Sequence, residues 1–329
     1  MIRLFRAIEG WDLLLAGLVA ATVSYGLVFV PSFFTAFNLS QLAAGVAEKA
    51  LLVLPMVPLI IAREIDLSVS STLALTSVAL GLLVQAGVPL FAAIPLTLLV
   101  GAALGVFNGV LVAKVGLPSL VVTLGTMALY RGIGYMLLGA GSINIFPDSL
   151  TDFGIDTIPG SYIPWVIAPF LLLAPVFAVA LQLMPVGRRI YAIGGNPNAA
   201  RYSGIGIDRV RFWLFVVSGA VCAIAGIVYT ARLANARANN ALGMELDVIT
   251  IVLLGGVSVW GGKGKLTGVV LALILIAMLR NLLGLNQIGG DAQGTVIGFL
   301  LIGSLLIGNS TAFLALRLKS IEARAKASG

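Results

Sequence analysis

Few residues in this sequence are able to carry catalytic or metal chemistry. The chain has no histidine and one cysteine, Cys222, which excludes histidine-based acid–base or metal sites and an internal disulfide. Residues 261–267 (Gly-Gly-Lys-Gly-Lys-Leu-Thr) have the composition of a phosphate-binding loop. They lack the G-x-x-x-x-G-K-S/T spacing, and no strand precedes them. We interpret them as a basic turn between two helices, and we expect no catalytic, metal or cofactor site in this chain.

Isolated polar side chains within apolar runs form a second group of interest. Asn108, Arg131, Asn281 and Gln293 each interrupt such a run. Ionisable residues inside a membrane usually face a cavity or a partner, and amides are suited to binding hydroxyl groups. The four residues are therefore candidates for lining a translocation pathway. Hydrogen bonding between helices is the alternative for each of them.

The elements that must position these side chains are membrane helices. Of the 329 residues, 60% are hydrophobic and 10% are charged, and the mean hydropathy is +1.09. Soluble domains carry about 25% charged residues, so this chain is too apolar for water. We expect an all-α, polytopic helical bundle in one domain, residues 1–329. The first apolar run is too long for a signal peptide. Ten spans are predicted, at about 11–31, 41–62, 69–87, 89–113, 118–139, 162–184, 212–231, 247–260, 266–285 and 293–309, the eighth being short enough to be tilted, broken or re-entrant.

Charge predicts how this bundle lies in the membrane. Most of the 20 basic residues fall in segments that share one side if the N-terminus is cytoplasmic. The loop at 140–161 contains Asp148, Asp152 and Asp156 and no basic residue, so it is expected outside. Both termini are then cytoplasmic, in an inner (plasma) membrane. The net charge of +7 indicates contact with anionic lipid and not with nucleic acid.

A weak internal repeat is also visible. Glu64-Ile65-Asp66 follows the second span, and Glu245-Leu246-Asp247 precedes the eighth. On the predicted topology the two triplets lie on opposite sides of the membrane. Spans 2–5 and 7–10 would then be inverted repeats, a common design among transporters.

The longest cytoplasmic insertion is the loop at 187–211, which is basic and punctuated by glycine. Asn196 and Pro197 are suited to the N-cap and first position of a short helix. Ala199, Ala200 and Tyr202 would form a small face on that helix, ending at Gly204. Small residues permit close docking, so this loop is our candidate contact with a soluble motor subunit.

Four ordered segments resemble the permease subunits of ABC sugar importers, the ribose, xylose, arabinose and galactoside branch. The 187–211 loop resembles their coupling loop, and residues 65–71 (IDLSVSS) resemble the GIDLSVGS stretch. Residues 117–127 with Arg131-Gly132, and residues 245–264, resemble two further family segments. Within the family the motifs lean towards the rhamnose or autoinducer group. Arg63-Glu64 departs from the usual pair of small residues, and Ser70 replaces a glycine.

The resemblance implies a transport subunit, not an enzyme, that moves a monosaccharide or related polyol. It implies three protein partners: an ABC ATPase that binds ATP and Mg²⁺, an external sugar-binding protein, and a second permease subunit, identical or not. The residues expected to couple the permease to the ATPase are Gly187, Arg188, Asn196, Ala199, Ala200, Arg201, Gly204 and Ile205.

The alternative is a secondary sugar carrier driven by an ion gradient. Such carriers use buried carboxylates as ion sites. Here nearly all acidic residues fall at predicted boundaries or in loops, and Glu48 is expected to form a structural pair with its neighbour Lys49. A membrane enzyme is less favoured still, because no nucleophile–base arrangement is apparent.

Overall fold

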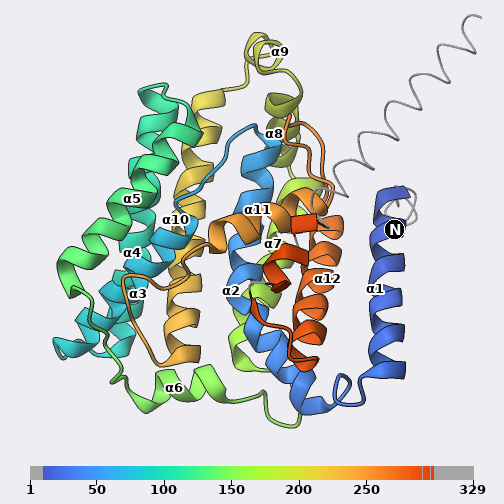
Figure 1. Cartoon of the computed structure of the whole chain (residues 1–329). Helices are drawn as coiled ribbons and strands as arrows, with labels where there is room; N and C mark the ends of the chain where they lie inside the picture. The colour runs from blue at the N-terminus through green and yellow to red at the C-terminus, as the bar shows by residue number, and fades with distance from the viewer. Residues whose placement is uncertain (1–9, 291, 297, 300–329) are drawn as a thin grey trace, which may run out of the picture.

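The computed structural model describes residues 10–290, 292–296 and 298–299, and this part of the chain confirms the all-α prediction. No β-strand occurs in these ranges (Figure 1). Among the described residues, 7 helices are long and apolar enough to cross a membrane. They are α1 (Gly10–Phe29), α2 (Ala36–Ile61), α4 (Leu90–Gly109) continued by the π-helical turn Val110–Lys114, α5 (Ser119–Leu138), α7 (Ala168–Gln182) preceded by the 3₁₀ turn Trp165–Ile167, α10 (Ile207–Leu233) and α12 (Leu266–Leu285).

The remaining helices are shorter. They are α3 (Val69–Gln85), α6 (Asp148–Ile155), α8 (Pro185–Gly195), α9 (Pro197–Tyr202) and α11 (Met244–Leu254). The expected eighth span is only the 11-residue α11, about 17 Å long at 1.5 Å per residue, which is roughly half a bilayer core. It ends where Gly255 and Gly256 follow, the latter with φ +84°. The tenth expected span lies mostly outside the described residues.

Two helices form the centre of the bundle. All residues of α2 from Ala50 to Ile61 are buried, and the helix lies among α7, α10, α11 and α12 (Figure 1). Helix α10 packs against α2, α3 and α4. Glycines bring α4 and α10 into backbone contact: a Cβ on Gly105 would lie 2.4 Å from the carbonyl oxygen of Phe215. Small residues therefore set the closest helix pair, as expected for a membrane bundle.

Two short helices begin inside the bundle and not at its ends. The chain leaves α2 as a non-helical segment, 62–68, and enters α3 at about mid-height (Figure 1). A second non-helical segment, 234–243, returns from the end of α10 and leads into α11. Ser70 Oγ donates a hydrogen bond of 2.5 Å to Glu245 Oε2, which joins the starts of the two helices. The acidic triplets noted in the sequence adjoin these two breaks, but the inverted repeat itself stays a prediction.

The two polar loops lie at opposite ends of the bundle. Figure 1 shows α6, within the acidic 140–161 loop, at one end, and α8 and α9, within the basic 187–211 loop, at the other. This arrangement is the one expected if the two loops face opposite sides of a membrane. Which end faces the cytoplasm stays a prediction based on charge.

Candidate coupling surface and polar interior

The 187–211 loop contains two consecutive short helices, α8 and α9. Pro185 begins α8, and the Oδ1 atom of Asn196 accepts a hydrogen bond of 3.1 Å from the backbone N–H of Ala199 at the start of α9. The predicted N-cap at Asn196 and helix start at Pro197 are confirmed. The chain turns after α9 at Gly204, which has φ +79°.

This helix pair is fastened to the end of α2. The Arg63 guanidinium donates from Nε to the carbonyl of Gly194 (2.7 Å) and from Nη2 to the carbonyl of Gly195 (3.0 Å). These are the last carbonyls of α8, where a cation also favours the helix dipole. A Cβ on Gly194 would lie 1.7 Å from the carbonyl oxygen of Ile61, so only glycine permits this approach. Any displacement of α8 therefore bears directly on α2.

The turn at 255–265 is the second attachment of the pair. Tyr191 on α8 donates a hydrogen bond of 2.7 Å to the carbonyl of Gly264. The N–H of Gly262 donates to the carbonyl of Ile61 at 2.9 Å. The glycine-rich run thus serves here as a junction between α8, α2 and α12, in agreement with its interpretation as a turn.

The predicted face of Ala199 and Ala200 is wrong. Ala199 is exposed, whereas Ala200 is 4% exposed and packs in the main hydrophobic core. Neighbouring residues on a helix point about 100° apart, so the two cannot share one face. Tyr202, 92% exposed, lies on the outer surface. Of the predicted coupling residues, the exposed ones are Arg188, Asn196, Ala199, Arg201 and Gly204, Ile205 is half-buried, and Gly187 and Ala200 are buried.

An ion pair lies beside this attachment. The Nε of Arg211 is 2.5 Å from the Oε1 of Glu64, whose side chain is buried. Burial raises the pKa of the Glu64 carboxyl, and the Arg211 charge opposes that rise. Both residues that depart from the family pattern therefore make specific contacts, Arg63 with α8 and Glu64 with α10.

Three carboxylates are buried. Glu48, Glu64 and Asp66 are each less than 5% exposed. Glu64 and Asp66 lie in the connector after α2, where the sequence places them, whereas Glu48 lies within α2. Asp66 accepts hydrogen bonds from the hydroxyls of Ser68 (2.6 Å) and Ser218 (2.8 Å). These bonds satisfy the carboxylate and hold the non-helical segment 62–68 against α10.

The pathway candidates do not meet in one place. Asn108 is buried, donates from Nδ2 to Ser68 Oγ at 2.9 Å, and accepts from the Tyr130 hydroxyl at 3.2 Å. Arg131 Nη1 donates to the carbonyls of Ala238 (2.8 Å) and Asn240 (2.6 Å) in the non-helical segment before α11. Both side chains hold the bundle together at its two breaks.

The other two candidates lie elsewhere. Asn281 on α12 exchanges two hydrogen bonds of 2.9 Å with Asn38 on α2. Gln293 is half-buried and donates from Nε2 to the carbonyl of Ile288 at 2.8 Å. Asn281 alone among the four lines the cavity described below, next to Lys49 and Arg280.

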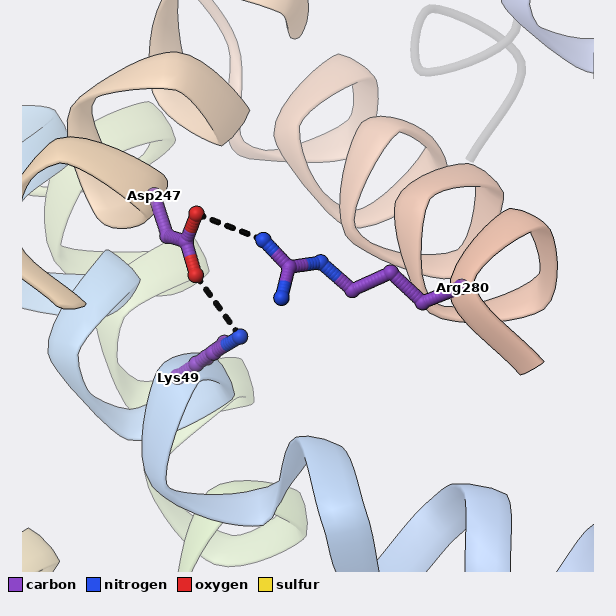
Figure 2. A network of polar contacts seen from close by, with 3 residues as sticks. All are labelled: Lys49, Asp247 and Arg280. Carbon is purple, nitrogen blue, oxygen red and sulfur yellow. Dashed lines mark hydrogen bonds and ion pairs between the residues drawn. The ribbon is translucent and has the colours of Figure 1, made fainter. Parts of the chain in front are cut away.

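A network of charges joins three helices in the interior. The carboxylate of Asp247 on α11 forms ion pairs with Lys49 Nζ on α2 at 2.8 Å and with Arg280 Nη2 on α12 at 2.7 Å (Figure 2). The expected pair of Lys49 with Glu48 is wrong, because adjacent residues leave α2 in different directions. Glu48 instead binds Arg232 of α10 at 2.7 Å.

Comparison with known proteins gives this arrangement a class. Residues 38–305 match a family described as branched-chain amino acid transport system / permease component. The chain belongs to this permease family. It is therefore a multi-pass inner-membrane transport subunit and not an enzyme. Permeases of this family work in general with an ATPase and a solute-binding protein.

Curated relatives cover most of the permease. The ribose import permease protein RbsC of Haemophilus influenzae is 35% identical over 283 residues, 85% of this chain and 87% of the relative. The autoinducer 2 import system permease protein LsrD of Yersinia enterocolitica is 34% identical over 307 residues, 91% of this chain and 90% of the relative. The LsrD protein of Photorhabdus luminescens is 34% identical over 302 residues, 89% of each chain. No solved structure matches the permease.

Sequence reasoning missed several residues that organise this permease. Arg63 was noted only as a departure from the family pattern, although a cation just after an apolar helix is a recognisable signal for binding helix-terminal carbonyls. Arg280 stands in an apolar run, which marked it as a cavity candidate, but its pairing with Asp247, 33 positions away, was not predicted. Ser70 gave no signal of its contact with Glu245, because the two residues are 175 positions apart.

Proposed function

We propose that this chain is the membrane permease of an ATP-driven ABC importer for a sugar or a sugar-derived polyol. The relatives named for ribose and autoinducer 2 import support a solute of this class. The solute would arrive on an external binding protein that docks at the α6 end of the bundle. ATP and Mg²⁺ would be bound by a separate ATPase at the α8–α9 end.

The main support for a coupling role of the α8–α9 pair is the attachment of α8 to α2 by Arg63. An exposed helix pair carrying Arg188, Ala199, Arg201 and Tyr202 presents a basic and aromatic surface to a partner. Aromatic and arginine side chains are enriched where protein interfaces are tight. Movement of the ATPase against α9 would pass through α8 to the central α2, and the bundle would rock between outward and inward access.

The proposal includes orientation and assembly. The basic α8–α9 end faces the cytoplasm, as do both termini, and a second permease, identical or paired, completes the pathway. An ion-gradient carrier is the less favoured alternative. Such a carrier needs buried carboxylates as ion sites, and two of the buried carboxylates here, Glu48 and Glu64, are already paired with arginines.

The test is transport by the assembled complex. The permease is reconstituted in proteoliposomes with its partner ATPase and binding protein, and uptake of labelled ribose, xylose, arabinose, galactose, rhamnose and leucine is measured. We expect uptake of at least one sugar that requires ATP and is unaffected when ion gradients are collapsed. Uptake of leucine alone, as the family description would allow, refutes the sugar assignment. Uptake that follows an ion gradient without ATP refutes the importer mechanism.

A further inference from the structure

The charged network of Figure 2 borders a cavity. The space is about 230 Å³ and lies between α2, α11 and α12. Its polar lining comes from Gln41, Lys49, Arg280 and Asn281, and its apolar lining includes Ile251 and Leu273. Sites for drug-sized ligands occupy roughly 300–1,000 Å³, so this cavity suits a smaller solute.

The network lies deep in the bundle. Lys49 is near the middle of the 26-residue α2, and its side chain is 17% exposed. Asp247 lies in the first turn of α11, the helix that is too short to span a bilayer. Charges at such depth are costly and commonly mark the path of a solute, and broken helices commonly place that site near the midplane.

The hydrogen-bonding capacity of the network is not used up by its own ion pairs. Each carboxylate oxygen of Asp247 receives one cation, and an ionised carboxylate accepts about four hydrogen bonds in all. The buried Nε of Arg280 has no hydrogen-bond partner among the described residues. The donors Lys49 and Arg280 therefore line the cavity wall, and the acceptor Asp247 is in direct contact with both of them.

We propose that this cavity binds the hydroxyl groups of the transported polyol, an inference that rests on the proposed function. A hydroxyl both donates and accepts, so adjacent hydroxyls match Asp247 as acceptor and Lys49 and Arg280 as donors. The apolar wall formed by Ile251 and Leu273 contacts the carbon faces of the ring. A simple anion would use the cations only and leave the capacity of Asp247 unused.

The first test fills the cavity and leaves the ion pairs intact. A Cβ on Gly45, which lines the cavity, would meet nothing within 4 Å, so Gly45→Leu adds a side chain there without a clash at Cβ. Gly17 on α1 is equally open and lies outside the cavity, so Gly17→Leu is the matched control. In proteoliposomes we expect Gly45→Leu to raise the KM for sugar uptake by about tenfold or more, which is the effect of losing one to two hydrogen bonds to the sugar. We expect Gly17→Leu to leave the KM unchanged. Equal KM values in the two variants overturn the proposal.

The second test separates binding from structural support. Asp247→Asn and Glu48→Gln each break an ion pair that involves α2, but only Asp247 belongs to the cavity network. We expect both to lower thermal stability and only Asp247→Asn to raise the KM for the sugar. A KM that is raised equally by both variants, or by neither, shows that the network is only a structural tie.

The third test does not depend on ATP-driven transport. In Cys222→Ser, Gly45→Cys membranes, the rate of labelling by a small thiol reagent is measured with each of the five sugars above, with leucine and with inorganic phosphate. We expect at least one sugar to slow labelling several-fold, and leucine and phosphate to have no effect. Protection by phosphate or leucine alone, or by none of the compounds, refutes a polyol site even where sugar uptake succeeds. Protection by a sugar without ATP-dependent uptake supports the site and refutes the importer mechanism instead.

Discussion

Replacing Arg63 with alanine should loosen α8 without unfolding the bundle. The substitution removes both hydrogen bonds from the guanidinium to the carbonyls of Gly194 and Gly195. Hydrogen bonds to a charged group contribute about 1.5–3 kcal/mol each when buried. Arg63 is exposed, so water and entropy reduce the pair to about 1–2 kcal/mol. Local opening of α8 should then become roughly 5 to 30 times more frequent.

Hydrogen exchange of the α8 amides measures that opening directly. Arg63→Lys keeps the charge but lacks the planar fork that reaches two carbonyls, so we expect an intermediate rate. Arg63→Gly suits the backbone, because residue 63 has φ 67°, and should match alanine in α8 exchange while raising overall stability above that of Arg63→Ala. Arg188→Ala, on the exposed side of α8, is the control and should leave exchange unchanged. Unaltered α8 exchange in Arg63→Ala would refute the attachment of α8 to α2.

Three other predictions concern the orientation in the membrane, the contact with the ATPase and the packing of α4 on α10. In a Cys222→Ser background, a cysteine at Ser203 should label only from the cytoplasm and one at Ser149 only from outside, and the reverse pattern contradicts the orientation. Ala199→Glu should fold normally but prevent co-purification of the ATPase, because Ala199 is exposed on α9. Ala200→Glu buries a charge and should expose α9 to proteolysis. Intact ATPase binding by a folded Ala199→Glu variant would refute the coupling role of α9. Gly105→Val should lower the unfolding temperature through an overpacking cost of about 1–3 kcal/mol. Gly132→Val is the control and should not lower it, because a Cβ on Gly132 meets nothing within 4 Å. Equal unfolding temperatures of the two variants would disprove the close contact between α4 and α10.

Local signals in the sequence were sufficient for some elements of this fold. Asn196-Pro197 specified the start of α9, because an N-cap side chain and a first-turn proline act within three residues. The length of the eighth apolar segment, 247–260, likewise indicated less than a full span, and α11 is shorter still because it ends before Gly255 and Gly256, the latter with positive φ.

Contacts between distant segments were not predictable in the same way. Asn38 and Asn281 pair across 243 positions, and Arg63 reaches Gly194 across 131. Local periodicity carries no information on which helices become neighbours. For the same reason the polar residues of the interior were identified as important but assigned to one pathway, whereas Asn108 and Arg131 hold different helix breaks in place. The direction of Ala200 was missed because the core that covers it comes from other helices.

The central claim is that ATP hydrolysis on a partner drives solute movement in this chain through α8 and α9. The most direct measurement is the number of sugar molecules imported per ATP hydrolysed, compared between wild-type and Arg63→Ala complexes in proteoliposomes. We expect Arg63→Ala to retain the bound ATPase and its hydrolysis but to import several-fold less sugar per ATP. An unchanged ratio, with α8 shown to be loosened, would contradict the claim that movement passes from the ATPase through α8 to α2.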